Sequence, residues 1–149
     1  MAQYKIKLSA MRIDRRFDNT TPRIKGNFTQ LQEVFFNFID NAFDAMLERK
    51  NTLNEENYRG QIKVSALAGD GVLKINIEDN GVGIIEEHVN KIFQIFLRSS
   101  DFKNGLGIGL YIVKEALTKI GGKILVKSEF GKGTTFTLVV PNQHSLLNR

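Results

Sequence analysis

The spacing of apolar residues predicts one long amphipathic helix in the first third of the chain. In the segment Phe28–Arg49 they recur every three or four residues, at Leu31, Val34, Phe35, Phe38, Ala42, Ala45 and Met46. Before this helix, Tyr4–Ile13 alternates between apolar and polar positions, which predicts a half-exposed strand at the edge of a sheet. After it, the polar stretch Asn51–Gly60 is typical of a loop.

The rest of the chain predicts a hairpin, further helices and two closing strands. Strands at Gln61–Ala68 and Val72–Glu78 flank a turn rich in glycine and are expected to pair. The remaining elements are short helices within Glu86–Phe96, a buried helix at Gly107–Ile120, and strands at Lys123–Lys127 and Thr134–Val140, the last ended by Pro141. This order predicts an α+β fold, a two-layer α/β sandwich with about three helices on one face of a mixed five-stranded sheet.

Composition narrows the class of protein. The chain has 149 residues, of which 42% are hydrophobic and 25% charged, and this fits one globular domain spanning residues 1–149. The absence of cysteine excludes disulfide scaffolds, thiolate zinc sites and cysteine nucleophiles. No uncharged apolar run approaches the roughly 18 to 20 residues of a membrane span, so we expect a cytoplasmic domain. The formal charge of +5 favours acidic partners, such as nucleic acid, phosphates or an anionic protein face.

Polar residues gather on one face of the long helix. They fall within an arc of roughly 100°, because steps of three and four residues return to the same face of a helix; they are Glu33, Asn37, Asp40, Asn41, Asp44 and Glu48. Exposure to solvent is the common explanation of such a face. Two asparagines in mid-helix are poor helix formers, however, and their carboxamide oxygens are good ligands for Mg²⁺. The face is therefore also a candidate site for magnesium and phosphate.

Glycine-rich loops are the second candidate feature. One of them, Gly81–Gly83, directly follows a predicted strand, and another, Gly105–Gly109, opens a predicted helix, where free backbone N–H groups bind anions. The dinucleotide-binding fingerprint is absent, because Glu86 and Leu110 stand where it needs a third glycine. The Gly131–Gly133 loop likewise fails the Walker pattern. Taken alone, each loop is better explained as a turn than as a binding site.

Taken together and in this order, these segments resemble the catalytic and ATP-binding domain of sensor histidine kinases. That superfamily also contains gyrase B-type and mismatch-repair ATPases. The similar segments are Leu31–Ala42 (asparagine box), Asp79–Gly83 (first glycine box), Ile92–Phe96 (phenylalanine box), Gly105–Leu110 (second glycine box) and Gly131–Phe136 (glycine-threonine element). The resemblance covers Lys5 to Pro141 and implies a Bergerat-type ATP-binding fold, with residues 142–149 as a C-terminal tail.

The resemblance implies how these residues bind ATP and Mg²⁺. Asp79 would accept a hydrogen bond from the adenine amine, and Gly83 would let the backbone approach the base. Asn37 would hold Mg²⁺, and Asn41 would contact the phosphates beside it. Backbone amides at the second glycine box would meet the triphosphate. The other nucleotide-binding candidates are Gly81, Ile84, Phe93, Gly105, Gly107, Ile108, Gly109, Leu110 and Thr135.

Besides Asn37, the resemblance suggests further catalytic side chains. Arg98, with Lys103 as a second candidate, would supply a mobile cation during phosphoryl transfer. Glu33 lies where hydrolytic relatives carry the general base that activates water, so its role stays open. Asp44 stands where many relatives carry a basic residue, which removes one phosphate contact.

The implied function is transfer of the γ-phosphoryl group of ATP to a histidine in two-component signal transduction. Neither His88 nor His144 has the sequence context of a phosphoacceptor histidine. The acceptor is therefore expected on a helical hairpin of the same full-length protein, outside these residues. A response regulator would be an indirect partner, and nucleic acid would not be one. We expect the isolated domain to be monomeric and the full-length kinase, which could be membrane-anchored, to be a homodimer.

Three alternatives remain open. Glu33 is compatible with a clamp-type ATPase of the same superfamily, and a serine kinase acting on an anti-sigma partner shares the nucleotide fold. A nucleic-acid or protein-binding module is suggested by a basic cluster with aromatic neighbours, made up of Arg12, Arg15, Arg16, Arg23, Lys25, Phe17 and Phe28. That last alternative leaves the glycine boxes without a purpose.

Overall fold

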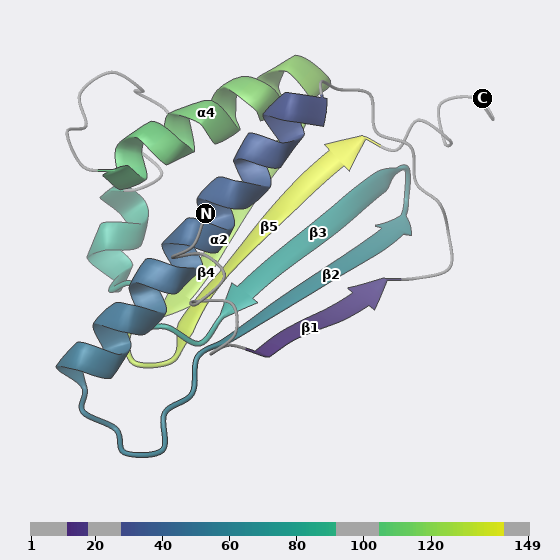
Figure 1. Cartoon of the computed structure of the whole chain (residues 1–149). Coiled ribbons are helices and arrows are strands. Elements are labelled where there is room, and N and C mark those ends of the chain that lie inside the picture. The colour runs from purple at the N-terminus through teal and green to yellow at the C-terminus, as the bar shows by residue number, and fades with distance from the viewer. Residues whose placement is uncertain (1–11, 18–27, 92–104, 142–149) are drawn as a thin grey trace.

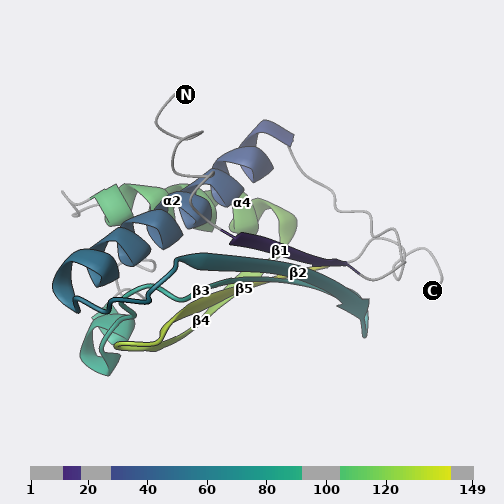
Figure 2. The ribbon, with the colours of Figure 1, turned by 60° about the horizontal axis from the view of Figure 1, so that its bottom comes forward.

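The structure is a computed structural model that describes residues 12–17, 28–91 and 105–141. Two helices lie on one face of a twisted sheet (Figures 1 and 2). In chain order the elements are β1 (Arg12–Phe17), α2 (Phe28–Thr52), β2 (Gln61–Gly69), β3 (Val72–Asp79), α4 (Gly105–Ile120), β4 (Lys123–Glu129) and β5 (Gly133–Pro141). Residues 86–91 are also helical. The predicted α+β class is confirmed.

The strand order in the sheet is β1-β2-β3-β5-β4. Strands β2 to β5 pair in antiparallel fashion, and β1 lies parallel to β2 at the edge. In the middle of the sheet, Ile77 of β3 pairs with Val64 of β2 and with Phe136 of β5. The predicted hairpin of β2 and β3 is present, and its turn contains Asp70 and Gly71 at positive φ.

Several predicted boundaries differ from the observed ones. The strand expected at Tyr4–Ile13 overlaps β1 only at its last two residues, and residues 4–11 lie outside the part that the structure describes. β1 instead continues to Phe17, because β2 offers backbone partners from Gln61 to Ala66. Helices α2 and α4 and strands β4 and β5 are each two or three residues longer than predicted, since backbone pairing continues where the apolar pattern fades.

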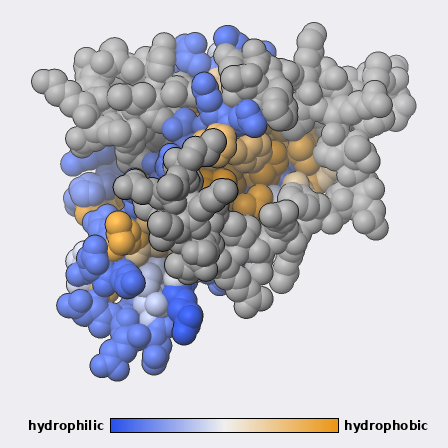
Figure 3. Space-filling model, in the orientation of Figure 1, coloured by the Kyte–Doolittle hydropathy of each residue, from blue (hydrophilic) through white to orange (hydrophobic). Residues whose placement is uncertain are grey.

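The core lies between α2 and α4 and the sheet. Phe38 of α2 stacks against Phe136 of β5, with 4.8 Å between the ring centroids. The other buried members of this cluster are Val34, Ala42, Phe43, Met46, Ile62, Leu73, Ile75, Ile77, Val113, Ala116, Leu117, Ile124, Leu138 and Val140. By contrast, the surface over the end of α2 and the loop that follows it is mostly hydrophilic, at the lower left of Figure 3. The core thus fixes α2 against the sheet and leaves its last turns accessible.

Candidate functional site

A cavity of about 490 Å³ lies between α2 and the ends of β3 and β5. Such a volume is in the range of sites that hold a small ligand. Its lining combines carboxylates, carboxamides and a few apolar side chains, from Asn37, Asp40, Asn41, Asp44, Ala45, Glu48, Asp79, Val82, Gly83, Ile84, Thr134 and Phe136. The lining therefore joins the predicted polar face of the helix to the first glycine loop.

Helix α2 has two functions on two faces. Val34, Phe38 and Ala42 are buried in the core, each about 1% exposed. Asn37 and Asn41, which directly precede Phe38 and Ala42 in the sequence, are half-buried and face the cavity. The packing that holds the helix on the sheet thus also presents the two carboxamides to the cavity.

Asp79 is the buried acid of the site. It ends β3, is 6% exposed, and accepts a hydrogen bond from the backbone N–H of Gly81, with 2.8 Å between nitrogen and Oδ1. Burial raises the pKa of Asp79 to about 6, although hydrogen bonds from the backbone N–H groups of Gly81 and Thr134 act in the opposite direction. A carboxylate has about four acceptor positions, so it keeps capacity for a donor inside the cavity.

The first glycine loop rests directly on α2. A Cβ added to Gly81 would lie 2.6 Å from the Cβ of Ala45, so this close approach requires glycine. The backbone N–H of Val82 donates to the carbonyl oxygen of Ala45 at 2.9 Å. Ala45 is thus the small surface against which the loop packs.

The same loop is held on its other side by the β4–β5 turn. Gly83 has a φ of +75°, and a Cβ there would collide with the carbonyl group of Glu129. The N–H of Ile84 donates to Oγ of Ser128 at 2.8 Å. Oγ of Ser128 lies 2.7 Å from Oγ1 of Thr134, which lines the cavity. Glycine at position 83 is thus required by contact with the protein backbone.

The structure brings together five of the predicted site residues. Asn37, Asn41, Asp79, Gly83 and Ile84 all line the cavity, and Gly81 belongs to the loop that carries Gly83 and Ile84 and packs against Ala45. These residues come from α2, from the end of β3 and from the loop after it. The site therefore combines the two boxes that the sequence placed about forty positions apart.

Two other predicted residues lie outside the cavity lining. Glu33, one turn before Asn37, is exposed and does not contribute to the lining. Thr135 does not contribute either, because side chains alternate along β5 and its neighbours Thr134 and Phe136 face the cavity. The sequence contained a signal for this arrangement. Apolar residues occur at the even-numbered positions of β5 from Phe136 onward, which predicts that the even-numbered side chains face the helices.

The second glycine box forms the first turns of α4. The helix starts at Gly105, two residues before the predicted start. The first N–H groups of a helix have no partner within it, so the start of α4 at Gly105 and Gly107 is where backbone amides are available to an anion. The N–H groups of Ile108, Gly109 and Leu110 are used inside the helix. Phe93, Arg98 and Lys103 lie outside the residues that the structure describes.

Sequence reasoning missed several residues that form the site. Thr134 and Phe136 line the cavity, and Ser128 connects the β4–β5 turn to the glycine loop. Only the alternation along β5 pointed to the first two, and nothing in the local sequence pointed to Ser128.

No helix in the described part of the chain is both long enough and apolar enough to cross a membrane.

Comparison with known protein families identifies the family to which the chain belongs. The family described as histidine kinase-, DNA gyrase B-, and HSP90-like ATPase matches residues 26–144. The chain belongs to this ATPase family. This match runs from just before α2 to just after β5, so it includes every element that lines the cavity.

Relatives of this ATPase domain are named as histidine kinases and sensor proteins. The alginate biosynthesis sensor protein KinB of Pseudomonas aeruginosa is 35% identical over 121 residues, covering 80% of this chain and 18% of KinB. The aerobic respiration control sensor protein ArcB of Escherichia coli strain K12 is 32% identical over 118 residues, covering 75% of this chain and 14% of ArcB. The chain thus spans less than a fifth of the length of either relative.

The fold is also found in a solved kinase domain. The catalytic domain of histidine kinase ThkA superposes with a TM-score of 0.70 at 25% identity, covering 94% of this chain and 84% of that one. The two chains thus share one architecture over most of their lengths.

Proposed function

We propose that this domain binds ATP with Mg²⁺ and donates the γ-phosphoryl group to a histidine on a separate phosphoacceptor hairpin. The observation that carries the proposal is a buried acceptor, Asp79, in the same cavity as the carboxamides of Asn37 and Asn41. One end of such a cavity suits a base with an amine donor, and the other suits phosphates and a metal.

The base end is formed by Asp79 and the glycine loop. The carboxylate of Asp79 accepts the hydrogen bond of the adenine amine, and this bond is stronger than a neutral one because the acceptor is charged. Val82 and Phe136, both buried, supply apolar surface to the same cavity. Adenine therefore finds both a specific acceptor and an apolar wall.

The phosphate end needs a cation. Asp40, Asp44 and Glu48 line the cavity, and the described lining includes no lysine or arginine. A triphosphate in a cavity lined by these carboxylates is repelled unless positive charge is added. The oxygens of Asn37 and Asn41 fit a hard divalent cation, and Mg²⁺ bound there would neutralise phosphate charge. We place Mg²⁺ at Asn37, with Asn41 as the phosphate contact beside it.

The remaining work of the domain is positioning. Phosphoryl transfer needs alignment and charge stabilisation more than covalent chemistry from the protein. The amides of Gly105 and Gly107 at the start of α4 are suited to bind phosphate oxygens, and Arg98 stays the candidate for a mobile cation. The nucleophile is a neutral imidazole, whose free lone pair needs no general base on this chain.

The position of Glu33 distinguishes the proposed kinase from an ATP-hydrolysing enzyme. A clamp-type ATPase would use it to activate water, but Glu33 is exposed and outside the cavity lining, which favours the kinase. We further propose that this domain is cytoplasmic, that the hairpin belongs to the same full-length protein, that the full-length kinase is a homodimer, and that a response regulator accepts the phosphoryl group next.

A transfer assay tests the proposal. A helical hairpin that carries a phosphoacceptor histidine is fused ahead of the chain, so that the tether raises its effective concentration, and the fusion is incubated with Mg-ATP. We expect a phosphorylated histidine, recognised because it is labile to acid and stable to base. The Asn37→Ala variant should lose this product, and Glu33→Gln should keep transfer within about tenfold, or about 1.4 kcal/mol of barrier. Acid-stable phosphoserine, or rapid hydrolysis that Glu33→Gln abolishes, would overturn the histidine kinase.

A further inference from the structure

Arg49 lies beneath the first glycine loop, one helical turn after Ala45. Its side chain is only 14% exposed. Its Nη1 donates to the carbonyl oxygens of Asn80 at 3.0 Å, Gly81 at 3.3 Å and Lys132 at 3.3 Å. One guanidinium therefore joins the end of α2 to the loop after β3 and to the β4–β5 turn.

The rest of the guanidinium is fixed by the α2–β2 loop. Nε and Nη2 of Arg49 donate to the two carboxylate oxygens of Glu55, at 2.9 Å and 3.0 Å. Its Cζ lies over the ring of Tyr58, 4.8 Å from the centroid. Bidentate pairing and ring stacking both restrict the orientation of a planar guanidinium. Arg49 is thus held in one direction, toward the glycine loop.

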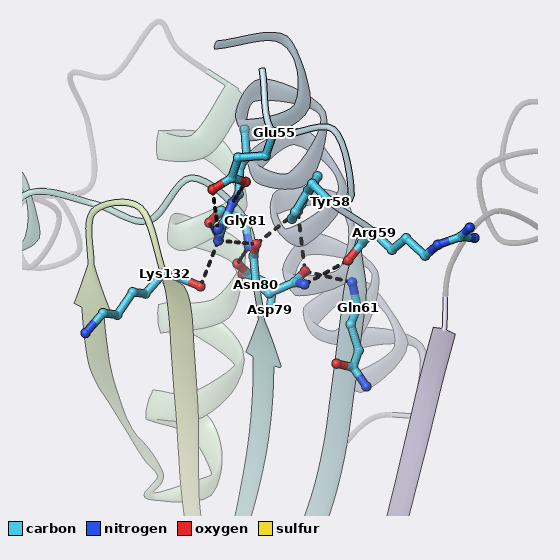
Figure 4. Close-up of polar contacts among 9 residues, drawn as sticks. Glu55, Tyr58, Arg59, Gln61, Asp79, Asn80, Gly81 and Lys132 are labelled. Atoms are coloured by element: carbon cyan, nitrogen blue, oxygen red, sulfur yellow. Dashed lines mark hydrogen bonds and ion pairs between the residues drawn. The ribbon is translucent and has the colours of Figure 1, made fainter. Parts of the chain in front are cut away.

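Asn80 makes hydrogen bonds through both its backbone and its side chain (Figure 4). Its carbonyl oxygen also accepts from the hydroxyl of Tyr58 at 2.9 Å. Its Oδ1 accepts from the backbone N–H of Gln61 at 2.7 Å, and its Nδ2 donates to the carbonyl oxygen of Arg59 at 2.9 Å. The residue that follows Asp79 therefore has a single allowed position.

The two peptides after Asp79 are the ones that Arg49 holds. The Gly81 N–H donates to Oδ1 of Asp79, and Arg49 binds the carbonyls of Asn80 and Gly81 on either side of that N–H. A shift of these peptides would turn the N–H away and change where the carboxylate points. Lysine has no planar fork of donors and cannot reproduce the arrangement.

We propose that Arg49 is a positioning residue for recognition of the nucleotide base, acting through the peptides that orient Asp79. Tyr58 supports it through its ring and through its hydroxyl. This inference rests on the proposed function, in which Asp79 accepts a hydrogen bond from the adenine amine. A residue that served only the stability of the fold would weaken binding of every nucleotide to the same degree.

Base selectivity tests the inference. Inosine triphosphate has a carbonyl oxygen where ATP has the amine, so it cannot donate to Asp79. Dissociation constants for Mg-ATP and Mg-ITP are measured by titration calorimetry, well below the melting temperature of each variant. The charge-assisted hydrogen bond predicts that the parent prefers ATP by roughly tenfold or more. Arg49→Met and Arg49→Lys should both reduce this preference at least about threefold, mainly by weakening ATP.

Lys50→Met is the matched control. Lys50 is the next residue of α2, is exposed, and like Arg49 carries a positive charge in the last turn of the helix. Replacing it removes the same favourable charge from the helix C-terminus but leaves the glycine loop untouched. Its ratio of dissociation constants should equal that of the parent.

The outcomes distinguish the inference from the function on which it rests. A parent that binds ATP and ITP equally would overturn the role of Asp79 and the proposed function with it. A parent that prefers ATP, with the preference unchanged in Arg49→Met, would overturn the role of Arg49 alone. If Arg49→Met does not fold, Tyr58→Phe and Glu55→Gln take its place, because the first removes a hydrogen bond to the Asn80 carbonyl oxygen that Arg49 also binds, and the second removes the charge that pairs with Arg49. An unchanged ratio in both of these folded variants would also overturn the inference.

Discussion

Replacing Asp79 with asparagine should make the nucleotide-free domain more stable and at the same time weaken nucleotide binding. Asp79 is the one buried carboxyl group among the residues that the structure describes. Burial raises its pKa from 3.8 to about 6, so at neutral pH the folded protein holds a charge that water would solvate better. The asparagine has no charge to desolvate and keeps an oxygen for the Gly81 N–H.

The size of the effect follows from the shift in pKa. A rise of about two units corresponds to about 3 kcal/mol, at about 1.4 kcal/mol for each unit. The folded state keeps its proton at a pH where the unfolded state has lost it, so stability decreases as the pH rises from about 4 to about 6. Asp79→Asn lacks this decrease, and its advantage over the parent should grow to about 3 kcal/mol by pH 7.

Urea denaturation at a series of pH values measures this difference. The free energy of unfolding of the parent minus that of Asp79→Asn is compared between pH 4 and pH 7, so that all other titrating groups cancel. Glu78→Gln is the control, because Glu78 is exposed and is only the smallest contributor to the raised pKa of Asp79. The free energy of unfolding of Glu78→Gln should decrease with pH as that of the parent does. The decrease should occur at a slightly lower pH, because Glu78 no longer raises the pKa of Asp79.

Binding gives the second half of the prediction. ADP affinity of the parent should rise as Asp79 ionises near pH 6, and Asp79→Asn should bind ADP about 1 to 3 kcal/mol more weakly at pH 7. A difference in unfolding free energy that stays constant from pH 4 to pH 7 would refute the raised pKa. Equal ADP affinity in parent and variant would refute the contact with the base.

Three further substitutions test other parts of the site. Asn37→Ala should reduce Mg-dependent transfer far more than adenosine binding, measured side by side; equal losses would assign Asn37 to packing. Thr134→Val should weaken ADP binding by about 1 kcal/mol, because it removes a hydroxyl that lines the cavity and contacts Ser128. Thr135→Val should leave ADP binding unchanged, because Thr135 is not part of the lining. Gly83→Ala should lower the free energy of unfolding by about 1 to 3 kcal/mol in urea, because its positive φ and its close backbone contact exclude a Cβ; an unchanged midpoint contradicts this.

The features predicted best from the sequence are those that depend on residues close together along the chain. The period of α2 placed Asn37 and Asn41 on one face, since a regular helix determines which side chains share a face. The contacts of Ser128 and Arg49 could not be predicted in this way. They join residues of α2, of the loop after β3 and of the β4–β5 turn, which meet only in the folded sheet. Position 134 shows the intermediate case, because the alternation along β5 predicts that Thr134 lies on the helix side of the sheet, and Thr134 lines the cavity.

Because the β4–β5 turn supports the cavity, nucleotide can bind only after β4 and β5 have folded onto the rest of the domain. Asn37 lies on the first described helix and Phe136 on the last strand, yet both line one cavity. A partly folded chain that contained α2 and the β2–β3 hairpin, but not β4 and β5, would have no wall behind Asp79 and no support for Gly83. The energy of binding is thus available only to the finished structure. Nucleotide should therefore slow the unfolding of the last two strands as much as it slows that of the helix that faces it.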